Sequence, residues 1–215
     1  MPIGIQLDKN FAIKFARDAQ QEVKKQLMAA IPASIKRIKK RIQEDVTQRL
    51  YGSSVYASLA NGSLEAEFGL VDGPSRISDI IDLWVNSIEV KFDPSAGDLG
   101  GISIGIFRSG WGDVLSSAAA EFTAQNKRGQ GTPLEWLKWL LLEGDRVIVA
   151  NYRFEPSNKG TSRTGEGIMI KTRGGGWNVP PQFAGVDNDN FATRALEGIQ
   201  DTIDYFVRQE ITKGL

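Results

Sequence analysis

The segment TRGGGWNVPPQFAGVDNDNF, residues 172–191, shows no regular hydrophobic period. It combines three consecutive glycines, two adjacent prolines and several Asn and Asp residues with the large aromatic side chains of Trp177, Phe183 and Phe191. Glycine and proline produce turns and extended backbone, whereas large aromatic side chains need an apolar surface to pack on. The segment is therefore either a flexible linker or a loop held in one shape, and its surroundings decide between the two.

Four segments upstream of this loop predict β-strands, because apolar residues occupy alternate positions in each. They cover residues 85–92, 100–108, 145–154 and 165–172, and the fourth runs directly into the loop. Partial alternation indicates one buried and one solvated face, which is typical of an antiparallel sheet covered on one side. A similar alternation of Leu64, Ala66 and Phe68 follows a turn predicted at Asn61-Gly62.

Helices are predicted where apolar residues recur at spacings of three and four. The longest begins at an N-cap residue, Asp8, and ends near Leu50, and Pro32 either divides it into two helices or bends one. Shorter helices are predicted at residues 76–84, at residues 132–144 with Thr132 as N-cap and Pro133 in the first turn, and from Asp189 or Asn190 to Thr212.

These elements predict an α+β fold. An antiparallel sheet of about four strands, packed with helices, forms a domain at residues 51–215, and a long helical N-terminal arm at residues 1–50 precedes it.

The chain of 215 residues contains neither cysteine nor histidine. It therefore has no disulfide, no thiolate or imidazole metal ligand, no cysteine nucleophile and no Ser-His-Asp triad. No apolar run reaches the roughly 18 residues of a membrane helix, and the N-terminus shows no secretory signal pattern. We expect a globular, non-enzymatic protein with no cofactor, no bound metal and no membrane association.

Two other motifs have simple explanations. The glycine-rich pieces TRGGGW and GEGIMI lack the lysine and hydroxyl residue of a phosphate-binding loop, and turn formation accounts for their glycines. VDNDNF, residues 186–191, begins like a calcium loop but lacks the glycine at the sixth position and the acid at the twelfth. Helix capping by Asp189 or Asn190 explains its spacing, and a weak surface cation is the alternative.

One enzymatic alternative is a phage-encoded, metal-dependent nuclease. The segment IEVK, residues 88–91, places Glu89 and Lys91 on one strand face downstream of Asp82. This arrangement is similar to that of PD-ExK nucleases, in which carboxylates bind magnesium and the lysine steadies phosphate or hydroxide. Alternating charged residues on a solvated strand face give the same pattern without any chemistry, and this is the simpler interpretation.

Charge is distributed unevenly along the chain. Residues 1–50 carry eleven Lys and Arg against five Asp and Glu, and the remainder carries fifteen against twenty-one. The basic excess peaks in IKRIKKRI, residues 35–42, which holds Lys36, Arg37, Lys39, Lys40 and Arg41 and no acid. This segment predicts contact with an acidic partner, either a protein, which we favour, or DNA, and a merely solvated helix face is the alternative.

Three motifs in the C-terminal third are distinctive in combination: Ser-Arg-Thr-Gly at 162–165, Gly-Trp-Asn-Val-Pro-Pro-Gln-Phe-Ala-Gly at 176–185 and Asp-Asn-Phe-Ala-Thr-Arg-Ala at 189–195. With these motifs the C-terminal third resembles the virion neck and tail-completion proteins of tailed bacteriophages. Residues 136–152 are similar to the same family, whereas residues 1–50 resemble only a generic helical start.

The resemblance implies a structural subunit of the head-to-tail junction, similar to the minor tail protein Z class. Such a subunit assembles in the host cytoplasm, resides in the neck or tail of the virion and docks other neck and tail proteins without catalysis. The resemblance also implies a homo-oligomeric ring, with six-fold symmetry favoured, around a lumen through which DNA passes.

In this interpretation the loop is a contact element. The two prolines hold extended backbone and bias the preceding valine, so the tryptophan and phenylalanine that flank them become rigid apolar anchors. The asparagine and arginine at the start of the next helix hold the loop down. The predicted interface comprises Trp177, Val179, Pro180, Pro181, Phe183, Asn190 and Arg194. The alternative is that Trp177 and Phe183 fill the domain's own core.

Overall fold

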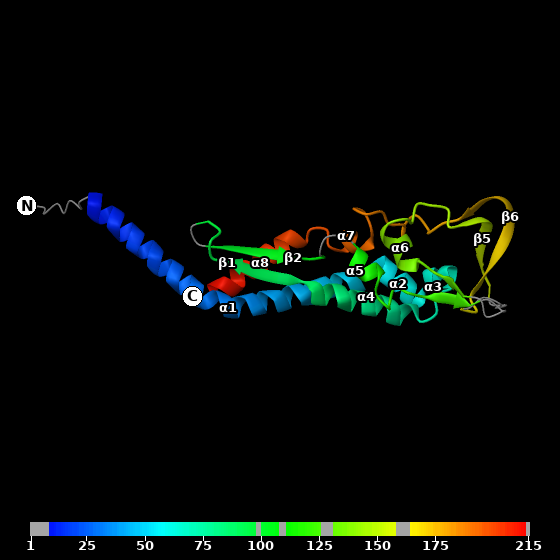
Figure 1. Ribbon diagram of the computed structural model, residues 1–215, viewed down its shortest axis with the longest axis horizontal. Coiled ribbons are helices and arrows are strands. Elements are labelled where there is room, and N and C mark those ends of the chain that lie inside the picture. The colour runs from blue at the N-terminus through cyan, green and yellow to red at the C-terminus, as the bar shows by residue number, and fades with distance from the viewer. Residues whose placement is uncertain (1–8, 98–99, 108–110, 126–130, 158–163, 214–215) are drawn as a thin grey trace, which may run out of the picture. The chain divides into compact units, whose positions relative to one another are not determined.

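A computed structural model describes residues 9–97, 100–107, 111–125, 131–157 and 164–213 (Figure 1). The N-cap predicted at Asp8, the strand end predicted at Arg108, and Ser162 and Arg163 of the Ser-Arg-Thr-Gly motif lie outside these residues. The described residues form eight helices and six strands, so the α+β class and the long N-terminal helix are confirmed.

The chain divides into two compact units. The first comprises Met1–Ile42, Glu89–Gly105 and Gln200–Leu215, and the second comprises Gln43–Ile88 and Ile106–Ile199. These units interleave along the chain, whereas the sequence analysis divides it once, at residue 50. That division stays a prediction.

The first unit is built from two helices and one hairpin. Its helices are the first part of α1 (Lys9–Tyr51) and α8 (Ile199–Thr212). Its hairpin is formed by strands β1 (Glu89–Asp93) and β2 (Gly101–Gly105), which pair antiparallel. Figure 1 shows α8 in red beside the blue α1. The buried apolar side chains of this unit are Ile31, Ile38 and Ile42 on α1 and Ile203 on α8.

The second unit holds the remaining elements. Its helices are α2 (Ser54–Asn61), α3 (Ser63–Phe68), α4 (Gly73–Ser87), α5 (Gly112–Leu115), α6 (Trp136–Leu141) and α7 (Phe191–Ala195). Its strands are β3 (Thr123–Gln125), β4 (Gly131–Pro133), β5 (Val149–Pro156) and β6 (Gly167–Trp177). Side chains that are fully buried here include Leu59, Leu64, Leu70, Ile77, Ile80, Ile81, Trp136 and Leu140. The α4 residues among them recur at spacings of three and four, which explains why this helix presents one apolar face.

The prediction of one sheet of about four strands is wrong. All four predicted strands exist, but β1 pairs only with β2 and β5 only with β6 in the described part of the chain, and β3 with β4 makes a third two-stranded sheet. Alternation shows which residues are extended and which face is buried, but it does not specify the partner strand. Most of β5 is exposed, and a bulge at Asn151, whose φ is 60°, shifts its register against β6.

Helix α1 continues through Pro32, so the prediction of two separate helices is wrong and the bent helix is the correct alternative. The ribbon of α1 changes direction within its N-terminal half (Figure 1). Proline removes one backbone donor and crowds the carbonyl four residues earlier, which bends a helix. Pro32 itself is exposed, and the nearby Ser34 hydroxyl donates to the Ala30 carbonyl oxygen at 3.3 Å.

Three local predictions also need correction. Leu64, Ala66 and Phe68, predicted as strand-like, are buried residues of helix α3. Alternation over so few residues does not distinguish a strand from a short helix. Thr132 and Pro133 belong to β4, and α6 begins only at Trp136 with no side-chain cap from Glu135. Residues 85–87, predicted as strand, end α4.

The C-terminal helix is interrupted. The predicted single helix is divided into α7 and α8 by Gly198, whose φ of 70° is outside the right-handed helical region. The prediction that Asn190 caps the start of this region is confirmed.

Candidate functional site

The loop after β6 begins at a tryptophan that packs inside the second unit. The Trp177 ring meets the rings of Phe68 and Trp139 edge-on, with centroid distances of 5.7 and 6.1 Å. Its indole Nε1 donates to the Glu67 carboxylate at 3.1 Å, and its carbonyl oxygen accepts the Ile148 amide at 2.8 Å. With only 7% of its surface exposed, Trp177 fixes where the loop departs from the hairpin.

The two prolines then form a turn. The Pro180 carbonyl oxygen accepts the amides of Phe183 at 2.8 Å and Ala184 at 3.0 Å. Val179 is fully buried, Phe183 is 8% exposed, Pro180 is half-buried and Pro181 is exposed. The turn therefore directs its apolar side chains inward and leaves one proline at the surface.

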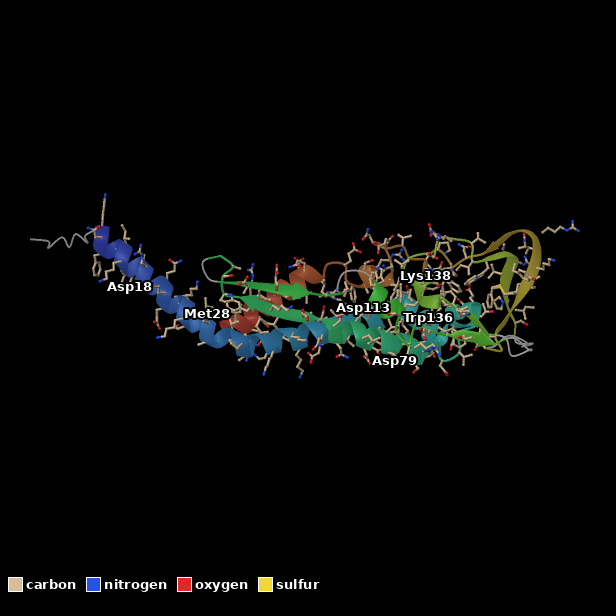
Figure 2. All side chains as sticks on the ribbon, viewed as in Figure 1. Asp18, Met28, Asp79, Asp113, Trp136 and Lys138 are labelled. Carbon is tan, nitrogen blue, oxygen red and sulfur yellow. The ribbon has the colours of Figure 1, made fainter. Side chains whose placement is uncertain are left out.

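The middle of the loop lies against the end of α6, whose residues Trp136 and Lys138 are labelled in Figure 2. The Gly144 amide donates to the Gly185 carbonyl at 3.1 Å. A Cβ at Gly185 would lie 1.9 Å from the Leu140 carbonyl oxygen, so only glycine allows this approach of two backbones.

The end of the loop is held by a fully buried asparagine. The Asn190 side-chain oxygen accepts the amides of Ala192 at 3.1 Å and Thr193 at 3.2 Å, and the Thr193 hydroxyl accepts the Asn190 amide at 2.9 Å. Its Nδ2 group donates toward the carbonyl oxygens of Leu141, Val186 and Asp187, at 3.4, 3.2 and 3.2 Å. One amide side chain thus caps α7 and closes the loop onto α6.

A salt bridge covers the same corner. The Arg194 guanidinium donates to the Asp189 carboxylate at 2.5 Å and to the Ala184 carbonyl at 3.1 Å. The hydrogen bond from Arg194 lowers the pKa of the Asp189 carboxyl group. The indole of Trp111 adds a bond to the Asp187 carboxylate at 3.1 Å. The strand predicted to end at Thr172 runs on to Trp177, so the glycines of TRGGGW lie in β6 and not in a turn. The rest of the segment, residues 178–190, is a loop held in one shape.

The structure separates the predicted interface residues into two groups. Trp177, Val179, Phe183 and Asn190 are buried among residues of this chain, which fits the alternative that the aromatic pair fills the chain's own core. Pro181 and Arg194 are exposed and Pro180 is half-buried. The four buried residues hold the loop in place, and the three others form its surface.

A cavity of about 440 Å³, not identified from the sequence, lies next to the start of the loop. Its walls include the rings of Phe68, Trp139, Phe154 and Trp177, the Met169 side chain and the Glu67 carboxylate. The residues come from α3, α6 and the β5–β6 hairpin, so sequence spacing alone could not bring them together. A mostly apolar cavity with four aromatic residues and one acidic residue suits an apolar or aromatic side chain with a cation beside it.

The basic segment, residues 35–42, lies on α1 in the first unit, and its five basic residues fall into two groups. Arg37 and Arg41 reach the Glu210 carboxylate of α8, at 2.7 and 3.1 Å, and the Arg41 guanidinium lies 4.1 Å from the centre of the Phe206 ring. Lys213 also binds Glu210, at 3.0 Å. Lys36 and Lys40 are exposed and Lys39 is half-buried. The two arginines therefore join α1 to α8, and Lys36, Lys39 and Lys40 are the other basic residues of the predicted partner contact.

The three candidate nuclease residues lie on two different elements, β1 and α4. Glu89 and Lys91 share one face of β1, as predicted, and their side chains form a salt bridge of 2.8 Å. Asp82 is an exposed residue of α4. Within the described residues, no group of three or more His, Cys, Asp or Glu side chains is placed to hold a metal ion.

Comparison with known proteins gives no match: no protein-family model, no curated protein and no solved structure is similar to this chain. In the part of the chain that the structure describes, no helix is both long and apolar enough to cross a bilayer.

Proposed function

We propose that this chain is a structural, non-enzymatic subunit of the head-to-tail junction of a tailed bacteriophage. In this role it docks other neck and tail proteins, forms a homo-oligomeric ring with six-fold symmetry favoured, and resides in the virion after assembly in the host cytoplasm. The proposal starts from the sequence resemblance at residues 162–195.

The shape of the loop at residues 178–190, between β6 and α7, is the observation that carries the proposal. Loops of this composition are commonly mobile, yet this one is held by Trp177, Gly185 and Asn190 against α3 and α6. Pre-ordered surfaces lose little conformational entropy when they bind, so they suit assembly by docking. Of the predicted interface residues, Pro181 and Arg194 are exposed on this surface.

The N-terminal part of α1 is a second supporting observation. Every residue from Lys9 to Val23 is exposed, including the large apolar side chains of Phe11, Ile13 and Phe15. A helix with no tertiary partner is marginally stable in water, so this stretch needs another surface to lie on. In an assembly, this part of α1 can pack on a neighbouring subunit, which provides such a surface.

No observation favours the nuclease alternative. Glu89 and Lys91 pair with each other at 2.8 Å on an exposed strand face, which fits the simpler interpretation of alternating charges on a solvated strand. We therefore carry forward only the assembly role.

The proposal is tested in phage whose gene for this chain is removed and then supplied in trans. We expect the deleted phage to produce filled heads and separate tails, and complementation to restore joined virions in which gold-labelled antibody to this chain marks the neck. Joined, infectious virions that form without the chain would show that the proposed function is wrong.

A further inference from the structure

Two surface features of the chain match in chemical character. One is the cavity beside Trp177, whose mostly apolar lining includes four aromatic residues and Met169, itself 37% exposed. The other is the pair Phe11 and Phe15 on α1, 56% and 66% exposed, whose rings stack at 6.4 Å. Pockets that bind ligands or anchor side chains measure roughly 300–1,000 Å³, so the cavity is large enough to accept an aromatic side chain.

The Phe11–Phe15 pair lies on a basic stretch of helix. Between Lys9 and Ala30 the chain carries five Lys or Arg residues and two acidic residues, one of which is Asp18, labelled in Figure 2 with its side chain projecting from α1. Two such helices from different copies would repel one another, because both carry an excess of positive charge. We therefore expect the surface that binds this part of α1 to carry acidic residues, which a second copy of α1 does not provide in excess.

The cavity has one acidic lining residue, and a second acid is next to a lining residue in the sequence. Glu67 forms part of its wall, and Glu166 adjoins the lining residue Gly167. Burial raises the pKa of the nearby Glu65, and the carboxylates of Glu166 and Asp72 raise it further, although a hydrogen bond from the Gly73 amide lowers it. Like charges therefore gather on this side of the second unit, and an approaching cation would relieve their repulsion. The basic residues of β6, Lys171 and Arg173, form no part of the lining.

We propose that the cavity accepts Phe11 and Phe15 from α1 of a second copy of this chain. The aromatic rings enter the space between Trp139, Trp177 and Met169, and the basic residues around them face the acidic residue of the cavity wall. Because the inserted segment and the cavity are different surfaces of one chain, the contact is head-to-tail and can repeat from copy to copy. Such a contact closes into a ring when the rotation between copies allows it, and otherwise it extends into a filament.

This inference names the contact between subunits of the proposed ring. It rests on the proposed function only for the place where the ring acts, because the contact can be measured with the purified chain alone. The chain contains no cysteine, so a single introduced cysteine has no competing thiol. Full-length Phe15→Cys is mixed, under mild oxidation, with full-length Met169→Cys that carries an affinity tag. The matched control is Gln20→Cys, an exposed neutral position that lies about 140° around the helix from Phe15.

We expect a disulfide-linked pair of the two variants, at about ten times the yield obtained with Gln20→Cys, which corresponds to about 1.4 kcal/mol of preference. Phe11→Ala combined with Phe15→Ala should also shift the unmodified chain toward monomer in sedimentation velocity, and because both rings are exposed this variant keeps its fold. Equal yields from Phe15→Cys and Gln20→Cys would overturn the proposal. So would an intramolecular link in a dilute Phe15→Cys/Met169→Cys double variant. Neither result affects the neck labelling that tests the proposed function.

Discussion

At the scale of single residues, Asn190 is the side chain on which the loop depends most. It is fully buried, its oxygen caps α7, and its nitrogen donates toward carbonyl oxygens of α6 and of the loop itself. The capping role was predicted as one of two alternatives, Asp189 or Asn190, because Asp and Asn are both favoured at the N-cap. The contact with Leu141 was not predictable, because residues 49 positions apart are brought together only by the folded chain.

Replacing Asn190 with alanine should destabilise the protein by about 2–4 kcal/mol, because the cap is lost and buried carbonyl and amide groups are left unpaired. Urea unfolding followed by circular dichroism measures the change. The matched control is Asn188→Ala in the same loop, where the side chain is exposed and the expected change is within about 0.5 kcal/mol. Equal unfolding midpoints for the two variants would show that Asn190 does not hold the loop.

At the scale of elements, local pattern predicted most of the secondary structure but not how it pairs. The amphipathic face of α4 and the alternation in β1, β2, β5 and β6 are visible in the sequence, because helix and strand periodicity depend on near neighbours. The separation into hairpins depends on contacts between distant residues and was missed. The same limit applies to the site, because the cavity beside Trp177 collects residues from three parts of the chain.

The pairing of α1 with α8 is also absent from any local pattern. Glu210 is a buried acid, with 5% of its side chain exposed, and it is bound by Arg37, Arg41 and Lys213. The hydrogen bond from Arg37, followed by that from Lys213, lowers the pKa of Glu210 from its ordinary value of 4.5 to about 2. Its carboxylate therefore stabilises the folded form fully above pH 4.5, and this contribution disappears as the pH falls toward 2.

We accordingly expect Glu210→Gln to lower the unfolding temperature at neutral pH, where it leaves Arg37 and Arg41 without their shared carboxylate. The difference from the unmodified chain should shrink as the pH is lowered below 4.5 and nearly vanish close to pH 2. Thermal unfolding measured by circular dichroism over this range gives both curves. Asp204→Asn, at an exposed position of the same helix, is the control. A difference that stays constant with pH would contradict the assigned role of the charged form.

At the scale of the whole molecule, charge divides the chain into a basic beginning and an acidic remainder. The excess of basic residues in the first 50 positions equals the excess of acidic residues in the rest. Such a chain offers each of its copies, and each neighbouring protein of similar composition, a surface of opposite sign. A dense cationic collar around moving DNA would instead bind phosphate tightly at physiological salt, which is why we favour a protein partner for the basic segment.

The final prediction concerns Lys36, Lys39 and Lys40, because replacing Arg37 or Arg41 would also remove a salt bridge to Glu210 within the first unit. Virions that carry Lys36→Gln, Lys39→Gln and Lys40→Gln together should show unjoined filled heads and free tails in negative-stain microscopy, since an acidic protein surface loses its cationic partner. A variant with Lys91, Lys171 and Arg173 changed to glutamine removes the same charge elsewhere and should join normally. Normal joining of the first variant with leaking genomes would instead identify DNA as the partner of this segment, because contacts with phosphate retain a genome without taking part in the docking of tails.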